Sequence, residues 1–188
     1  MAPSIPQTMK AIQLTGYKKP LELNEVPLPK VGENDLLIKI GAAGWCHTDY
    51  QVWEGVYKSE TPIIQSHEPV GTIVAMGPKA EKAGKWKIGQ RVGYLLFRHQ
   101  CHTCAACKNY DEIRFCQKAD HAGLDADGGM GEYSIGDADN AVLLPDEVPF
   151  EQAAPLMCAG ATTWGGLERL ELPPESYVGI VGIGGLGG

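Results

Sequence analysis

The chain has 188 residues, a formal net charge of −7 and 21% charged residues. This length suits one full domain and part of a second, and scattered lysines and arginines without a basic stripe argue against a nucleic-acid partner. No segment approaches the roughly 20 apolar residues of a membrane-spanning helix, and residues 1–10 lack the apolar centre of a secretory signal. We therefore expect a globular protein with no membrane partner and with free thiols that suit the reducing cytoplasm.

Short strands separated by glycine and proline are expected through the first 150 residues. Strand length and apolar or alternating character mark six segments. They are residues 9–14, 21–26, 36–40, 71–76, 91–96 and 141–144. A short helix is expected over residues 47–53. This spacing predicts a mainly β fold, a small barrel or sandwich, rather than a layered α/β sheet.

The composition changes after Pro149. Residues 150–170 are rich in Ala, Leu and Met, and their internal glycines predict two short helices, with Cys158 at the end of the first. Residues 177–183 are expected to form an apolar strand. That strand runs into a turn with G-x-G-x-x-G spacing, which is typical of dinucleotide binding but is equally frequent as a turn without a ligand. Its glycines are Gly182, Gly184 and Gly187.

All six cysteines fall where zinc ligands are expected. Four follow the spacing C-x2-C-x2-C-x8-C, which favours a closed structural site whose metal supplies folding energy. They are Cys101, Cys104, Cys107 and Cys116. The other two, Cys46 and Cys158, would join His67. Two thiolates and one imidazole leave a fourth position open, which is the pattern of a catalytic zinc.

Cysteines and a histidine in this pattern could also serve different chemistry. Three disulfides are disfavoured in a chain of this length without a secretory signal. The bacterial iron–sulfur run continues as C-x3-C-P, which the interval from Cys107 to Cys116 does not follow. Taken alone, His67 would more often be an ordinary half-buried histidine, and Thr48 or Asp49 would more often cap a helix. For His67, the presence of Cys46 and Cys158 in the same pattern makes a ligand role the preferred interpretation.

Five motifs, taken in order, resemble the zinc-dependent alcohol dehydrogenases of the medium-chain dehydrogenase/reductase superfamily, in particular the propanol-preferring type of fungi and bacteria. They are residues 44–49, residues 66–71, the four-cysteine lobe, residues 158–162 and the terminal glycines. The resemblance implies a GroES-like β-barrel with short helices and a zinc-binding lobe over residues 1–176, incomplete without the family's C-terminal return segment. It implies the first strand and glycine turn of a Rossmann domain over residues 177–188, and hence an N-terminal fragment.

The resemblance also implies roles around the catalytic zinc. Cys46, His67 and Cys158 would be ligands, and Glu68 would be an occasional extra ligand. Asp49 would accept the second imidazole N–H of His67 and so fix its tautomer.

Further roles concern the proton and the cofactor. Thr48 would take the proton of the zinc-bound alcohol. His47 would contact the cofactor pyrophosphate, and Thr162 would lie near the nicotinamide. Where many members carry a histidine that completes the proton relay, this chain has Gln51, which cannot titrate.

Two departures concern the loops. Ser66 and Pro69 replace two glycines of the usual motif, so this loop should be stiffer. The four-cysteine lobe has one extra residue before Cys116, which a loop tolerates.

The implied activity is oxidation of a small primary or secondary alcohol to an aldehyde or ketone, with NAD(P)+ as acceptor and Zn2+ at two sites. A homo-oligomer is compatible with the sequence. Two alternatives stay open, a cofactor-independent zinc hydrolase or lyase and a non-catalytic zinc-binding module.

Overall fold

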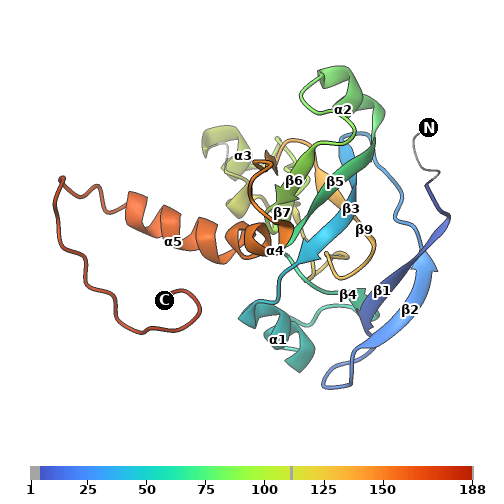
Figure 1. Ribbon diagram of the computed structural model, residues 1–188, viewed down its shortest axis with the longest axis horizontal. Helices are drawn as coiled ribbons and strands as arrows, with labels where there is room; N and C mark the ends of the chain where they lie inside the picture. The colour runs from blue at the N-terminus through green and yellow to red at the C-terminus, as the bar shows by residue number, and fades with distance from the viewer. Residues whose placement is uncertain (1–4, 111, 188) are drawn as a thin grey trace.

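In a computed structural model that describes residues 5–110 and 112–187, β-strands form the body of the protein (Figure 1). The strands are β1 (Thr8–Leu14), β2 (Glu22–Pro27), β3 (Asp35–Ala43), β4 (Ile63–Ile64), β5 (Pro69–Met76), β6 (Arg91–Tyr94), β7 (Phe97–Arg98), β8 (Asp120–His121), β9 (Tyr133–Asp137) and β10 (Ala141–Leu143). The helices are α1 (His47–Glu54), α2 (Pro78–Ala83), α3 (Ala105–Tyr110), α4 (Phe150–Ala153) and α5 (Ala159–Glu168), with 3₁₀ turns at Ile113–Phe115 and Ala154–Met157. None of the described helices is long and apolar enough to cross a bilayer.

Antiparallel pairing organises the strands into three sheets. The largest has the order β10-β6-β5-β3-β9, a second has the order β2-β1-β4, and β7 pairs with β8. A bridge between Ala11 and Gly131 joins the first two sheets, supported by a 2.8 Å hydrogen bond from the Ile12 N–H to the Met130 carbonyl. The mainly β fold expected from the sequence is confirmed; within the described residues the ladders do not close into a ring, and open sheets wrap around the core.

The core lies against β3, the strand between β5 and β9 in the largest sheet. Leu36, Leu37 and Ile38 are all buried, because β3 is covered on both faces and hydrogen-bonded on both edges, to β5 and β9. Trp86 and Tyr94 complete the main apolar cluster, and each has a polar partner for its ring N–H or hydroxyl. Aromatic side chains whose polar atoms are hydrogen-bonded in this way combine a large buried area with a fixed orientation.

The six strands expected from the sequence are confirmed as β1, β2, β3, β5, β6 and β10, with small shifts at their ends. The short helix expected over residues 47–53 is confirmed as α1. The sequence did not indicate β4, β7 and β8, which are two residues long and depend on tertiary pairing, or β9, which contains glycine and serine.

Two expectations for the C-terminal part were wrong. Gly160, Gly165 and Gly166 lie inside α5 instead of breaking it, because single glycines weaken a helix by only about 1 kcal/mol each. The break between the two helical segments lies at Cys158, where the backbone leaves the helical region. Residues 177–183 form no strand, since no described strand lies beside them to complete a ladder. They extend from the body together with α5, and Tyr177 and Val181 are fully exposed (Figure 1).

A charged cluster connects β7, β8 and the start of β3. The buried Arg98 guanidinium donates to Asp120 Oδ2 at 3.1 Å and to the Ile135 carbonyl at 2.8 Å. His99 Nε2 lies 2.8 Å from Asp35 Oδ1, and His99 Nδ1 lies 3.1 Å from Asp120 Oδ1. Hydrogen bonds to Asp120 and Asp35 raise the pKa of His99 to about 10. Burial alone would raise the pKa of Asp120, but His99 and Arg98 lower it to about 2.

We expect Asp120→Asn to lower the free energy of unfolding by about 3 kcal/mol near neutral pH, because the substitution leaves the Arg98 charge buried without its carboxylate. The folded-state pKa of Asp120 lies below the reference value of 3.8, so this contribution is present above pH 3.8 and is lost as the pH falls toward 2. Urea unfolding of the wild type and the variant from about pH 7 down to 3 should show the difference shrinking.

The matched control is Asp125→Asn, which removes the exposed partner of His121. This exposed pair should contribute less than about 1 kcal/mol. Equal losses of stability in the two variants would contradict the assignment of the large effect to the buried cluster.

Candidate metal centres

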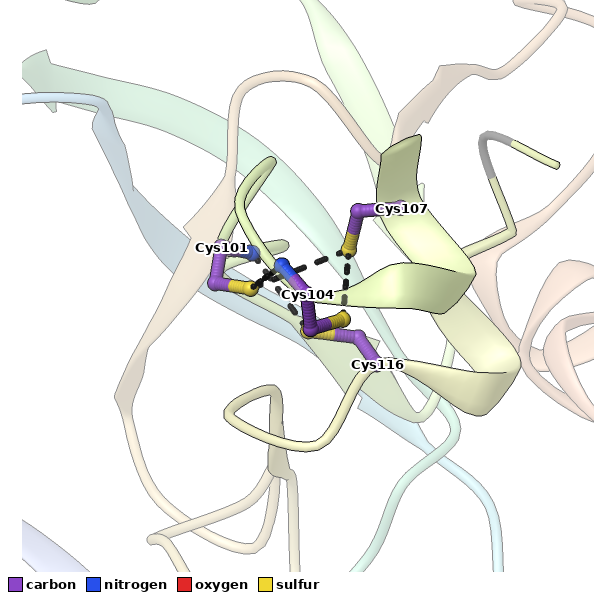
Figure 2. Close-up of side chains that lie close together, drawn as sticks. All are labelled: Cys101, Cys104, Cys107 and Cys116. Carbon is purple, nitrogen blue, oxygen red and sulfur yellow. Dashed lines mark hydrogen bonds between the residues drawn. The ribbon is translucent and has the colours of Figure 1, made fainter. Parts of the chain in front are cut away.

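The four cysteines of the predicted structural site come together in one lobe. Cys101 and Cys104 lie in the loop after β7, Cys107 lies in α3, and Cys116 follows the 3₁₀ turn Ile113–Phe115. Their sulfur atoms all lie within 4.8 Å of one another, and Figure 2 shows the side chains pointing toward a common centre. The Sγ of Cys107 is 3.8 Å from that of Cys101 and 3.3 Å from that of Cys104.

This arrangement fits a zinc ion. Zn–S bonds of about 2.3 Å in a tetrahedron place neighbouring sulfurs about 3.8 Å apart, which is close to the separations here. Backbone N–H groups of Thr103 and Cys104 lie 3.5 Å and 3.4 Å from the Cys101 sulfur. The Thr103 hydroxyl and these N–H groups lower the pKa of Cys101 to about 5, so the loop stabilises the thiolate form that a metal requires.

The second predicted set also converges, although its members come from three distant segments. Cys46 is the N-cap residue of α1, His67 and Glu68 lie between β4 and β5, and Cys158 precedes α5. One ligand atom from each residue lies within 4.8 Å of the others, and the Cys46 and Cys158 sulfurs are 3.9 Å apart. Sulfur, nitrogen and carboxylate oxygen are the donor types of zinc sites, so these residues fit the metal.

The Asp49 carboxylate organises this second set. Its Oδ2 accepts the Cys46 N–H at 2.9 Å, which completes a capping box at the start of α1, and its Oδ1 accepts the Ser66 N–H at 2.9 Å. His67 Nδ1 lies 3.7 Å from Asp49 Oδ1, too far for the hydrogen bond expected from the sequence, and none of the described residues gives it another hydrogen-bond partner. The N-cap residue of α1 is therefore Cys46 and not Asp49, which is the third helical residue; the Asp49 carboxylate closes the capping box and lies beside the imidazole.

The local charges favour ligand chemistry. Burial alone would lower the pKa of His67, but the Asp49 carboxylate and the Cys158 thiol outweigh it and raise the pKa to about 11. Burial opposes ionisation of Cys46, but the N–H and hydroxyl of Thr48 and the His67 imidazole bring its pKa below the ordinary value. A metal binding here would therefore displace a proton from the imidazole.

Glu68 is buried beside these groups. Its side chain is 4% exposed, and burial raises its pKa. A Cβ atom at Gly44 would lie 1.9 Å from Glu68 Oε2, so the glycine makes room for the carboxylate at the site. The position is compatible with the extra-ligand role implied for Glu68.

A cavity of about 590 Å³ opens beside the second set. His67, Cys158, Thr48 and Thr162 contribute to its wall, and the Thr48 hydroxyl lies 3.8 Å from the Cys46 sulfur. The rest of the wall is mostly apolar, with Leu95, Leu96, Phe97, Ile113 and Met157. The sequence motifs did not identify these residues as cavity lining, because ordinary apolar side chains carry no signal of a cavity. Ile113 nevertheless lies within the four-cysteine lobe, and Met157 directly precedes Cys158.

The residues predicted to bind the cofactor are not brought together. Thr162 lines the cavity, whereas His47 is exposed on α1 with its ring centroid 5.7 Å from that of Tyr50. The glycines Gly182, Gly184 and Gly187 lie in the exposed C-terminal stretch, away from the cavity residues. Sequence reasoning identified Ser66 only as a departure from a motif and missed its position at the centre of the hydrogen bonds around Asp49.

Comparison with known proteins agrees with this geometry. Residues 32–146 match the family model described as the alcohol dehydrogenase GroES-like domain. A curated alcohol dehydrogenase of Geobacillus stearothermophilus is 40% identical over 181 residues, which cover 95% of this chain and 52% of that protein. The chain therefore spans about half the length of the curated relatives it matches.

Solved structures agree as well. The alcohol dehydrogenase of Aeropyrum pernix superposes with a TM-score of 0.81 at 32% identity, covering 95% of this chain and 53% of the other. CAD from Helicobacter pylori, in complex with NADP(H), gives a TM-score of 0.84 at 28% identity, with coverages of 96% and 54%. Because the family model matches more than half of the residues, this chain belongs to the alcohol dehydrogenase GroES-like domain family.

Proposed function

We propose that this chain is the catalytic, GroES-like part of a zinc-dependent alcohol dehydrogenase, which converts a small alcohol and NAD(P)+ to an aldehyde or ketone and NAD(P)H. The observation that carries the proposal is the convergence of Cys46, His67 and Cys158 from three segments at the wall of an apolar cavity. Catalytic zinc sites combine such a ligand set with an open position beside a substrate cavity.

The ligand side chains would hold the catalytic metal at the cavity wall. A zinc ion held by these side chains would supply Lewis-acid chemistry toward the oxygen of an alcohol. Thr48 lines the same cavity, and its hydroxyl would receive the alcohol proton and pass it to water. Gln51 cannot accept that proton, and its side-chain oxygen is held by the Tyr57 hydroxyl at 3.1 Å. The apolar wall would exclude water and suits a small alcohol or aldehyde.

The cofactor would enter from the side of Thr162, and His47 would contact its pyrophosphate. We propose that residues 1–176 are the catalytic domain and that residues 177–188 lead into a dinucleotide-binding domain, where Gly182, Gly184 and Gly187 would approach the phosphates. The NADP(H) bound by the Helicobacter relative supports a nicotinamide cofactor. Six free cysteines support a reducing cytoplasmic location.

The four-cysteine lobe would hold a second, structural zinc. It offers four thiolates and hence no open position for a substrate. Its short helix and 3₁₀ turn bury few side chains, so metal coordination would supply much of the folding free energy of the lobe.

Elemental analysis of the intact polypeptide should find two zinc ions per chain. Cys107→Ser and Cys46→Ser should each reduce the content toward one, because a lost thiolate removes one of few ligands. Cys107→Ser should also lower the melting temperature, whereas Cys46→Ser should leave the lobe folded. The control is His102→Gln, which alters an exposed side chain within the lobe. Loss of zinc in this control, or two zinc ions in both cysteine variants, would contradict the ligand assignment.

Thr48→Ala should lower kcat for alcohol oxidation about 100-fold or more, because it removes the group that receives the proton. Thr48→Ser, which keeps a hydroxyl, should retain most of the activity. Formation of NAD(P)H by the intact polypeptide measures both, with zinc content verified in each variant. Alcohol turnover that needs zinc but no nicotinamide would overturn the dehydrogenase proposal, and full activity of the alanine variant would overturn the role of Thr48.

A further inference from the structure

Ser66 has a backbone conformation that few residues with a side chain adopt. It is completely buried and has a φ of 77°, in the left-handed region that favours glycine. It directly precedes His67. A serine held in this conformation at a functional site must be fixed by its surroundings.

The polar groups of Ser66 are all paired. Its N–H donates to Asp49 Oδ1 at 2.9 Å, and its carbonyl accepts the Gly129 N–H at 2.8 Å. Its hydroxyl donates to the Gly44 carbonyl at 2.8 Å and accepts the Glu68 N–H at 3.3 Å. The two hydroxyl bonds are available only because this residue is not glycine.

These bonds join two segments that carry ligands. Gly44 lies two residues before Cys46, and Glu68 directly follows His67. The Glu68 carbonyl also accepts the Gly44 N–H at 3.1 Å, so the two segments contact each other on both sides of the Ser66 hydroxyl. The Ser66 side chain thus spans the interval between the cysteine and the histidine of the site.

Packing on the opposite side fixes the backbone of Ser66. A Cβ atom at Gly128 would lie 2.0 Å from the Ser66 carbonyl oxygen, and one at Gly123 would lie 2.9 Å from its nitrogen. This close approach leaves Ser66 no room to move away from Asp49 and Gly44.

We propose that Ser66 is a positioning residue for the metal site, whose hydroxyl holds the His67 and Glu68 segment against the Cys46 segment and keeps the ligands assembled. This inference rests on the proposed catalytic metal centre. Substitution of residues that orient metal ligands typically lowers metal affinity about 10-fold to 100-fold, and we expect an effect in this range for Ser66.

The test compares zinc release to a chromogenic chelator from the intact polypeptide and from Ser66→Ala and Ser66→Gly. The phase of zinc release that is absent in Cys46→Ser reports the catalytic site, and the remaining phase of zinc release reports the four-cysteine site. Both Ser66 variants should weaken zinc binding at the catalytic site about tenfold or more and leave the other site unchanged. The glycine variant should unfold at a temperature at least as high as the alanine variant, because glycine relieves the backbone strain without restoring the hydroxyl bonds.

The matched control is Ser59→Ala, which removes a buried serine hydroxyl that has no hydrogen-bond partner among residues 5–110 and 112–187. It should leave both phases unchanged. Unchanged zinc affinity in both Ser66 variants would overturn the positioning role, as would equal weakening of the two sites. If the unsubstituted protein shows no catalytic-site phase, the proposed metal centre itself fails, an outcome distinct from failure at Ser66.

Discussion

The second candidate metal centre depends on the hydrogen bonds that the buried Asp49 carboxylate accepts. One carboxylate oxygen accepts the N–H of Cys46 at the start of α1, and the other accepts the N–H of Ser66. A single buried side chain therefore joins the segments that carry Cys46 and His67. A buried carboxylate is costly unless donors surround it, and here the backbone provides them. The hydrogen bonds to this one charge therefore place the Cys46 segment beside the segment of His67.

The two metal centres are built in different ways. The four-cysteine lobe is local in sequence, so a short loop and α3 bring its thiolates together with little help from the rest of the fold. The other centre takes Cys158 from a segment 112 positions after Cys46, so it exists only if the sheets are assembled. If the proposed zinc ions bind, the lobe would depend on its metal for folding, whereas the second set of side chains is brought together by the fold itself.

Sequence reasoning named the two sets of side chains that the fold brings together, because thiolate spacing and the companions of His67 are chemical signals that do not depend on tertiary detail. Their role as metal ligands stays a prediction. Sequence reasoning also placed the six main strands, whose alternation is encoded locally. It failed where tertiary contacts determine the secondary structure. The strands β7 and β8 are two residues each, and residues 177–183 have no described strand to pair with. The helix α5 also tolerates the glycines that were expected to break it. The role of Ser66 was equally hidden, because a positive φ in serine depends on the atoms packed around it.

The close approach of Gly44 to Glu68 has a consequence for variation among related chains. A side chain at position 44 would occupy the space of the Glu68 carboxylate. The two positions are therefore sterically coupled, and a larger residue at 44 should be accompanied by a shorter one at 68. A substitution at 44 alone would displace the carboxylate, whereas a shorter residue at 68 would first provide the space, so the two substitutions are accessible only together or in that order.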